Sequence, residues 1–289
     1  MMYRKGIILA GGKGTRLFPL TKVISKQLLP IYDKPMIYYP LATLMLANIR
    51  EILIISKSRD KENFKQLLGD GSALGISIEY KVQDIPEGIA QAFLIGESFL
   101  NNSNSALILG DNLFHGNEEM VAKVSVTREK GAHIFAYPVH DPQRYGVVSF
   151  NRNGKVTDIK EKPSRPDSKF AITGLYFYDD SVVERAKTIV PSKRGELEIT
   201  DLLKKYKEKG KLSADFIGRG GAWLDTGSIS DYYKTSNFVS AVENRQGFKV
   251  ACLEEIALLN NWITKKNIKD AIKFYGNCEY SIYLKRLIK

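Results

Sequence analysis

The sequence has 289 residues, which is enough for one large α/β domain with a small appendage or for two small domains. Hydrophobic residues at 44% and charged residues at 26% exclude a largely disordered chain. The formal net charge of +11 would suit a polyanionic partner, but the lysines and arginines are dispersed and no basic stretch is interleaved with aromatic residues. We therefore expect small phosphorylated ligands and no nucleic acid.

Membrane segments and cysteine chemistry are not indicated either. No run reaches the roughly 18 apolar residues of a membrane helix, and residues 1–5 lead into a short apolar run rather than into a signal peptide. Cys252 and Cys278 form no Cys-x-x-Cys pair, and the three histidines are unclustered. We expect a cytoplasmic protein with no disulfide framework, no cysteine zinc site and no membrane partner.

The first half of the chain alternates apolar runs typical of buried strands with amphipathic segments. This pattern predicts an α/β fold with a Rossmann-like, mostly parallel sheet flanked by helices. We expect strands at residues 7–10, 52–56, 76–82 and 106–110, and helices at residues 36–48, 61–68 and 89–100. Ligands bind outside the carboxyl ends of the strands in such sheets, so the residues after the first and the last of these strands should share one edge.

Shorter strands with polar connections follow from residue 131 onward. We expect strands at residues 133–139, 145–150, 155–161, 171–178 and 212–217, and helices at residues 181–189 and 198–209. The last forty or so residues have apolar positions at helical spacing. Because no glycine-serine linker intervenes, we expect one α/β domain over residues 1–240 and a helical subregion over residues 241–289 packed on it.

A glycine-rich loop follows the first expected strand at residues 11–16. Three glycines in four positions allow the backbone N–H groups to approach an anion. A Walker loop is excluded because Gly14, and not Ser or Thr, follows Lys13, and a dinucleotide fingerprint would need Gly or Ala at Leu17. An ordinary glycine turn remains the alternative. The basic residues that follow favour a phosphate ligand: Arg16, Lys22 and Lys26.

Two aspartates stand after apolar runs and beside small residues. Asp111 and Asp225 could hold one Mg²⁺ with substrate phosphates completing its shell, or each could cap a turn. No serine elbow, cysteine nucleophile or histidine metal motif is present. The supportable chemistry is electrostatic, as in phosphoryl or nucleotidyl transfer, with cations on both reactants. Lys162 could hold the attacking phosphate, or it could be an ordinary surface lysine.

Eight motifs in this order resemble those of the sugar nucleotidyltransferase family. They are residues 9–17 (LAGGKGTRL), 25–30 (SKQLLP), 86–92 (PEGIAQA), 109–112 (LGDN), 144–148 (RYGVV), 161–163 (EKP), 195–201 (GELEITD) and 223–227 (WLDTG). The resemblance runs essentially from end to end. It implies a nucleotide-binding part at about residues 1–112 and a sugar-binding part at about residues 113–240.

The activity that this resemblance implies is a Mg²⁺-dependent, single in-line transfer of dTMP from dTTP to α-D-glucose 1-phosphate, with release of pyrophosphate. The implied catalytic residues are Arg16, Lys26, Asp111, Lys162 and Asp225, with Asp111 and Asp225 holding the metal. The implied nucleotide-binding residues are Leu9, Gly11, Gly12, Gly14, Thr15, Arg16, Lys26, Gln83 and Gly88. The implied sugar-phosphate-binding residues are Asn112, Gly146, Glu161, Lys162, Ile172 and Arg194. Relatives of this kind are homotetramers with a second, regulatory nucleotide site, and their product feeds deoxysugar pathways such as dTDP-rhamnose synthesis.

The chain departs from the family pattern in three places. Residues 114–116 read Phe-His-Gly where relatives have Phe-Tyr-Gly, and Leu258-Leu259 replaces a tyrosine-arginine pair. Both changes lie in regions tied to the regulatory site, so they argue against feedback inhibition by dTDP-rhamnose. Residues 228–230 read Ser-Ile-Ser in place of Thr-His-Glu/Gln. The alternatives to thymidylyl transfer are uridylyl transfer to glucose 1-phosphate and a non-catalytic module that binds sugar nucleotides.

Overall fold

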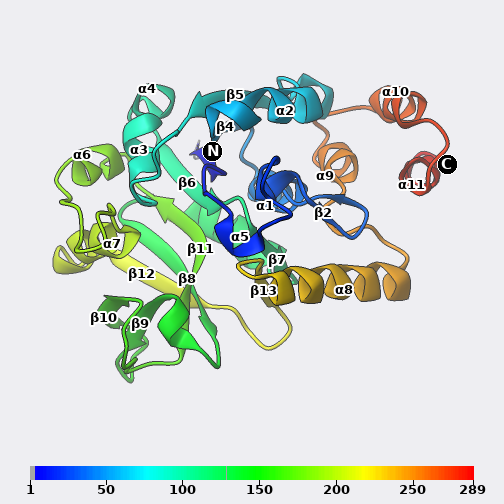
Figure 1. The fold of residues 1–289 in the computed structure, drawn as a ribbon. Helices are drawn as coiled ribbons and strands as arrows, with labels where there is room; N and C mark the ends of the chain where they lie inside the picture. The colour runs from blue at the N-terminus through cyan, green and yellow to red at the C-terminus, as the bar shows by residue number, and fades with distance from the viewer. Residues whose placement is uncertain (1–3, 128) are drawn as a thin grey trace.

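A nine-stranded sheet runs through the molecule, and its N-terminal half is parallel. The computed structural model describes residues 4–127 and 129–289 (Figure 1). The parallel half has the order β6-β1-β4-β5. These strands are β1 (Arg4–Leu9), β4 (Glu51–Ser56), β5 (Ser77–Val82) and β6 (Asn104–Leu109). The four strands expected here are confirmed, with small shifts at their ends.

The second half of the sheet is largely antiparallel. Its strands are β8 (Ala132–Pro138), β9 (Gly146–Phe150), β10 (Val156–Glu161), β11 (Phe170–Tyr178) and β12 (Leu212–Phe216). Strand β11 joins the two halves because it pairs antiparallel with β6, β8 and β9. Its pairing with β8 shifts register between Ile172 and Tyr176. This interruption matters for the site because Gly174 lies within it.

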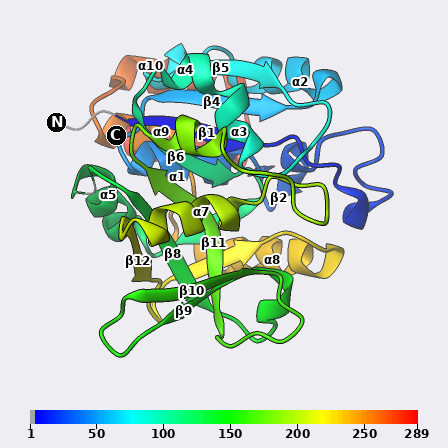
Figure 2. The same cartoon turned by 90° about the vertical axis from the view of Figure 1, so that its left-hand side faces the viewer.

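Helices cover both faces of the sheet, as the sequence pattern predicts (Figures 1 and 2). One face carries α3 (Gln91–Ile95), α4 (Glu97–Leu100), α6 (Val182–Ala186) and α7 (Ile199–Glu208). The other face carries α1 (Tyr38–Leu46), α5 (Glu118–Thr127) and α9 (Leu253–Leu259), while α2 (Ser58–Leu68) lies beside β5. Neighbouring strand residues point to opposite faces, so Ile7 and Ile8 are both fully buried but belong to different core clusters.

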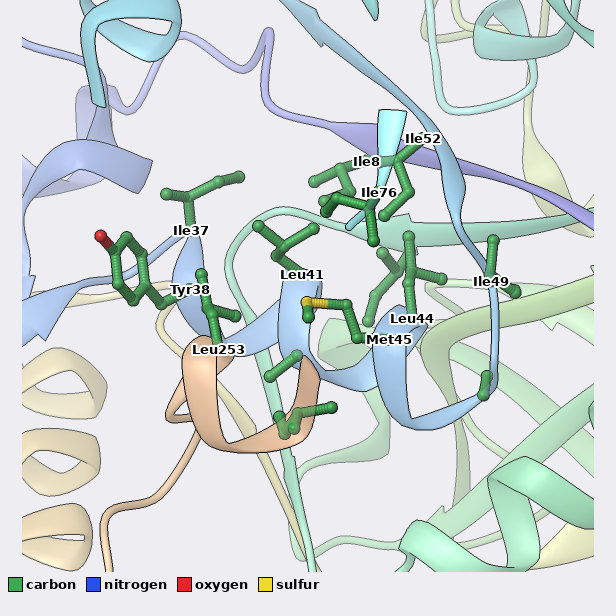
Figure 3. Packing of buried hydrophobic residues seen from close by; sticks show 14 of the residues in the cluster. Ile8, Ile37, Tyr38, Leu41, Leu44, Met45, Ile49, Ile52, Ile76 and Leu253 are labelled. Atoms are coloured by element: carbon green, nitrogen blue, oxygen red, sulfur yellow. The ribbon is translucent and has the colours of Figure 1, made fainter. Parts of the chain in front are cut away.

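Helix α1 forms the centre of the larger core cluster. Leu41 and Leu44 point toward the sheet residues Ile8 and Ile52, and Leu253 of α9 approaches α1 from the other side (Figure 3). All five side chains are at most 2% exposed. Burying a side chain of this size stabilises a fold by about 1.5–3 kcal/mol, so α1 ties the sheet to the C-terminal helices.

The C-terminal helices are α8 (Ile229–Gln246), α9, α10 (Lys265–Tyr275) and α11 (Glu279–Leu287). Ile268 and Leu284 from the last two are fully buried in the same cluster as α1. Residue 240, the expected end of the α/β domain, falls within α8. In the described parts of the chain, no helix is long and apolar enough to span a membrane.

Two differences from the expected elements concern helices. The helix expected at residues 89–100 is two short helices that divide at Gly96, since glycine weakens a helix interior. Gly96 lies against the sheet, where a Cβ would be 3.0 Å from Ile7 Cδ1. Helix α5 was not expected, and only the end of α8 falls within the helical subregion expected at residues 241–289. Small ribbons complete the fold: β2 (Pro30–Ile31) pairs with β3 (Lys34–Pro35), and β7 (Asn112–His115) pairs with β13 (Ala222–Asp225).

Candidate active site

Two cavities adjoin at the carboxyl ends of β1 and β6, and both are lined by Arg16 and Asp111. The first, here called the loop cavity, has a volume of about 240 Å³ and is lined by residues 12–17, Lys26, Gln27, Asp111 and Gly227. The second, here called the strand cavity, has a volume of about 340 Å³ and lies among β9, β10, β11 and β13. Two ligands placed in these cavities would meet beside Arg16 and Asp111.

The glycine loop is shaped by local contacts. Gly14 has φ 65°, a left-handed conformation that favours glycine, and its carbonyl accepts a 2.6 Å hydrogen bond from Thr21 Oγ1. A Cβ at Gly11 would lie 2.5 Å from Gln83 Oε1, whereas a Cβ at Gly12 would meet no atom within 4 Å. The loop therefore needs glycine at position 14 for its turn and at position 11 for close packing, and at position 12 it faces open space.

Lys26 and Asp111 form the central ion pair of the site. Lys26 is 6% exposed, and its Nζ lies 2.7 Å from Asp111 Oδ2. Asn112 Nδ2 donates a 2.9 Å hydrogen bond to the other carboxylate oxygen. Burial raises the pKa of Asp111, but the charge of Lys26 and the hydrogen bonds from Lys26 and Asn112 outweigh it and lower that pKa. Asp111 is therefore ionised at neutral pH.

The ribbon of β7 and β13 brings Asp225 to this pair. Asp225 stands opposite Asn112 in the antiparallel register, and Thr226 Oγ1 donates a 3.0 Å hydrogen bond to the carbonyl of Asp111. Burial and the charge of Asp111 raise the pKa of Asp225 to about 6, against the opposing charges of Lys26 and Arg16. Two neighbouring carboxylates of this kind are a suitable donor set for a divalent cation.

The remaining ligands of such a cation would have to come from substrate and water. In residues 4–127 and 129–289, no group of three or more His, Cys, Asp or Glu side chains is placed to hold a metal ion. Mg²⁺ fits this arrangement, because it commonly binds through one or two carboxylates and keeps several waters and phosphate oxygens.

The predicted sugar residues gather along the strand cavity. Gly146 of β9 pairs with Glu161 of β10, and a Cβ at Gly146 would lie 3.0 Å from Thr200 Cγ2 and 3.6 Å from Ile172 Cδ1. Lys162 has φ 38°, its backbone N–H bonds the Tyr145 carbonyl, and its Nζ lies 3.8 Å from Glu161 Oε1. Residue 146 must thus be small, and Lys162 leaves the strand in a turn beside the carboxylate.

Asn112 lies in the wall of the strand cavity but is only 2% exposed. Its Oδ1 accepts hydrogen bonds from Trp223 Nε1 at 2.6 Å and from the Gly174 N–H at 3.2 Å. A Cβ at Gly174 would lie 2.4 Å from that oxygen. The side chain of Asn112 therefore already holds β7, β11 and β13 together.

Arg194 lies outside the linings of both cavities. It forms a two-pronged pair with Glu198, with Nε and Nη2 each 3.0 Å from a carboxylate oxygen, and it also contacts Glu196 at 2.7 Å. Its Nη2 is 3.6 Å from Glu161 Oε1. Burial and the charge of Glu198 raise the pKa of Glu161, with Lys162 and Arg194 acting against them. Arg194 therefore opposes the rise in the pKa of Glu161 without lining either cavity.

The residues that line the loop cavity do not include four of the predicted nucleotide residues: Leu9, Gly11, Gln83 and Gly88. Leu9 ends β1, and its carbonyl accepts a 2.9 Å hydrogen bond from the Gly110 N–H. Gln83 is 4% exposed and lies against Gly11. Gly88 has φ 108°, and a Cβ there would lie 2.4 Å from the Leu197 carbonyl oxygen. The absence of a side chain at Gly88 thus allows the segments 86–92 and 195–201 to pack closely against each other.

Several further residues line the strand cavity, although no role was predicted for them. Arg144, Tyr145, Thr200 and Trp223 lie in the motifs quoted above, and Tyr145 and Trp223 meet edge to face with ring centroids 5.2 Å apart. Arg144 donates 2.8 Å hydrogen bonds to Asp141 and to Asp231 of α8. Their position within the motifs was the available signal, but only the folded chain shows which of them face the cavity.

The sheet and the cation-rich loop define the class of the protein: an α/β protein with two adjoining cavities at the carboxyl ends of its strands. Residues 5–242 match the model of the nucleotidyl transferase family. The chain is 53% identical over 286 residues to the glucose-1-phosphate thymidylyltransferase of Neisseria meningitidis, covering 99% of each chain. It is 46% identical over 285 residues to the enzyme of the same name from Mycobacterium tuberculosis, again covering 99% of each. The chain therefore belongs to the nucleotidyl transferase family and is a nucleotidyltransferase.

Solved structures agree with this assignment. A putative glucose-1-phosphate thymidylyltransferase from Bacillus anthracis, in complex with a sucrose, matches with a TM-score of 0.76 and 39% identity, over 81% of this chain and 94% of that one. A UDP-glucose pyrophosphorylase complexed with UDP-glucose matches with a TM-score of 0.72 and 26% identity, over 85% of this chain and 100% of that one. The ligand in the second structure is a uridine nucleotide, whereas the first structure is named for a thymidylyltransferase.

Proposed function

We propose that the chain transfers dTMP from dTTP to α-D-glucose 1-phosphate and releases dTDP-glucose and pyrophosphate. The observation that carries the proposal is the junction of the two cavities at Arg16 and Asp111. A triphosphate in the loop cavity and a sugar phosphate in the strand cavity would have their reacting ends there. Relatives with 46–53% identity over nearly the full length bear the matching name, which supports this choice of substrates.

The protein's main task is to bring two anions together. Two unit charges about 4 Å apart repel by about 4 kcal/mol at an effective dielectric of about 20, which is about a thousandfold in rate. Arg16 would hold the α-phosphate side of the triphosphate, since it lines both cavities. Lys26 keeps two of its three N–H donors available beside its bond to Asp111. Lys162 would hold the attacking phosphate in line.

A Mg²⁺ on Asp111 and Asp225 would supply further neutralisation of the triphosphate. Asn112 would hold Asp111 in place for this role, because it donates to that carboxylate while its own oxygen is fixed by Trp223. Thr226 would position the loop after Asp225 by its bond to the Asp111 carbonyl. The sugar would lie against Gly146, Glu161 and Ile172.

The decisive experiment is to incubate the protein with Mg²⁺, glucose 1-phosphate and each nucleoside triphosphate separately, and to measure pyrophosphate. Thymine differs from uracil by one methyl, worth about 1–3 kcal/mol, so we expect dTTP to be preferred with measurable use of UTP. Turnover of UTP equal to or above that of dTTP would favour uridylyl transfer, to which the UDP-glucose pyrophosphorylase likeness points. No release from folded protein with any nucleotide would favour a binding module.

The same resemblance leads us to propose a homotetramer acting in the cytoplasm, with dTDP-glucose passing to deoxysugar synthesis such as that of dTDP-rhamnose. Sedimentation velocity would test the tetramer. We also propose that feedback inhibition by dTDP-rhamnose is weak. Leu259 is 73% exposed and has no side-chain hydrogen-bond donor for a nucleotide, unlike the arginine of the family pattern. Strong inhibition by micromolar dTDP-rhamnose would contradict this.

A further inference from the structure

Helix α2 contacts residues 21–25, the segment that joins the glycine loop to Lys26. Arg16 precedes this segment, residues 21–25, and Lys26 follows it directly. Asp60 lies in the first turn of α2 and is 2% exposed, and its Oδ1 accepts a 3.1 Å hydrogen bond from the Ser25 N–H. A buried carboxylate is costly unless it is paired, so this contact is strongly constrained.

The neighbouring arginine completes the contact. Arg59 Nε donates to Asp60 Oδ2 at 3.2 Å, Nη1 to the Lys22 carbonyl at 3.2 Å, and Nη2 to the Thr21 carbonyl at 3.5 Å. One guanidinium thus binds the buried carboxylate and two consecutive backbone carbonyls. The planar, five-donor fork of arginine allows this, and a lysine could not reproduce it.

These contacts extend to the glycine loop. Thr21, whose carbonyl Arg59 binds, donates through Oγ1 to the Gly14 carbonyl at 2.6 Å. Gly14 in turn begins the 3₁₀ turn Thr15–Leu17 that carries Arg16. On the other side, Ser25 begins the 3₁₀ turn Lys26–Leu28. Two of the cations that line the loop cavity, Arg16 and Lys26, are therefore tied through short hydrogen-bonded chains to the same end of α2.

We propose that Arg59 and Asp60 are positioning residues for triphosphate binding, fixing residues 21–25 so that Arg16 and Lys26 stay at the loop cavity. This inference rests on the proposed function for its ligand. Neither side chain lines the cavity, so neither contacts the substrate directly. Small displacements of binding groups are expensive in such sites, because the reactants must be held in a reactive geometry.

The test compares Arg59→Gln with the matched variant Arg50→Gln. Arg50 is also an exposed arginine that donates to a backbone carbonyl, that of Gly75 at 2.8 Å, but it lines neither cavity and packs over the ring of Trp262. Binding of dTTP and of inorganic tripolyphosphate is measured by calorimetry, and thermal unfolding is followed for each protein. Tripolyphosphate needs no base recognition and probes the loop alone.

We expect Arg59→Gln to raise the Kd of both ligands and the KM for dTTP by about 5–10-fold, with the KM for glucose 1-phosphate unchanged. Arg59→Lys should recover part of the loss, and Arg50→Gln should leave both affinities as they are. Adding Asp60→Asn to Arg59→Gln should cost little more than the worse single change, because the two residues act as a unit.

Unchanged affinities in Arg59→Gln would overturn the inference, as would a wild-type protein that binds neither ligand. An equal rise in the KM values of both substrates would also overturn it, since that indicates general loosening. A protein that releases no pyrophosphate but binds tripolyphosphate in an Arg59-dependent way would refute the proposed function while leaving the role of Arg59 and Asp60 intact.

Discussion

Asp225 stands opposite Asn112 in the β7–β13 ribbon, where burial and the charge of Asp111 raise the pKa of Asp225 to about 6. A carboxyl whose folded-state pKa is raised destabilises the fold when it is ionised. Its ordinary value is 3.8, so the penalty is absent below about pH 4, grows between pH 4 and pH 6, and is complete above pH 6. At about 1.4 kcal/mol per pKa unit it amounts to about 3 kcal/mol without a divalent cation.

The first prediction follows for Asp225→Asn. With EDTA at pH 8, the variant should unfold several °C above the wild type, because it removes this repulsion. At pH 4.5 the difference should shrink to about a third, and it should approach zero only below about pH 4. Its turnover should fall at least about a hundredfold. Differential scanning fluorimetry across pH, with a parallel pyrophosphate assay, measures both effects. A variant that is less stable than the wild type at pH 8 would refute the electrostatic explanation.

The second prediction concerns the metal itself. The rise in unfolding temperature produced by dTTP should be larger with Mg²⁺ than with EDTA, by about 5 °C where Mg²⁺ tightens binding about a hundredfold. Asp225→Asn should lose this difference. Asp70→Asn, at an exposed aspartate whose carboxylate accepts hydrogen bonds from the neighbouring Ser72, serves as the control and should keep it. An undiminished Mg²⁺ effect in Asp225→Asn would remove that residue from the proposed metal site.

The third prediction concerns Arg16, which lines both cavities. Arg16→Ala should lower kcat/KM for dTTP by at least about a hundredfold, because it removes a fixed charge next to the reacting phosphorus. Arg16→Lys should recover little, since a lysine lacks the planar fork. Arg152→Ala in the exposed turn between β9 and β10 is the control. Steady-state kinetics measure this effect. A kcat/KM for dTTP in Arg16→Ala within threefold of the wild-type value would refute the proposed role of Arg16.

The fourth prediction concerns the sugar side. Arg144 lines the strand cavity and is held by Asp231 and Asp141, each at 2.8 Å. Asp231→Asn should free Arg144 from α8 and raise the KM for glucose 1-phosphate about 3–10-fold, with little effect on the KM for dTTP. The partly exposed pair itself is worth at most about 1 kcal/mol of stability. Asp201→Asn, which removes a similar pair with Lys204, is the control. An unchanged KM in Asp231→Asn would show that Arg144 needs no anchor.

Much of the fold could be predicted because the buried strands correspond to short apolar runs in the sequence. Helix α8 could not, since its buried residues are Thr235, Val239 and Glu243, which give no apolar stripe. Glu243 is buried because it accepts hydrogen bonds from Lys34 and Lys249, partners that local periodicity does not reveal. The ribbon of β7 and β13 could not be predicted either, because a four-residue strand has too few positions to show an alternation of apolar and polar residues.

Many of the residues that line the two cavities lie in the quoted motifs, but their partners could not be predicted. The motifs place Lys26 and Asp111 in the same region, yet their 2.7 Å contact spans a sequence separation of 85 residues. Arg194 was expected to bind the sugar phosphate. In the structure its guanidinium is paired with Glu196 and Glu198, which lie two and four residues further along the chain. Which charged groups pair with one another depends on side-chain geometry, and the spacing of residues in the sequence does not give that geometry.

The origin of β13 late in the chain has a consequence for biosynthesis. Residues 4–109 already contain the strands of the parallel half of the sheet, together with the glycine loop, Arg16 and Lys26. The second carboxylate arrives only with Ala222–Asp225, after every strand of the main sheet has been made. A nascent or truncated chain therefore carries Arg16 and Lys26 before it carries the complete carboxylate pair, so an interrupted product would lack half of the proposed metal site.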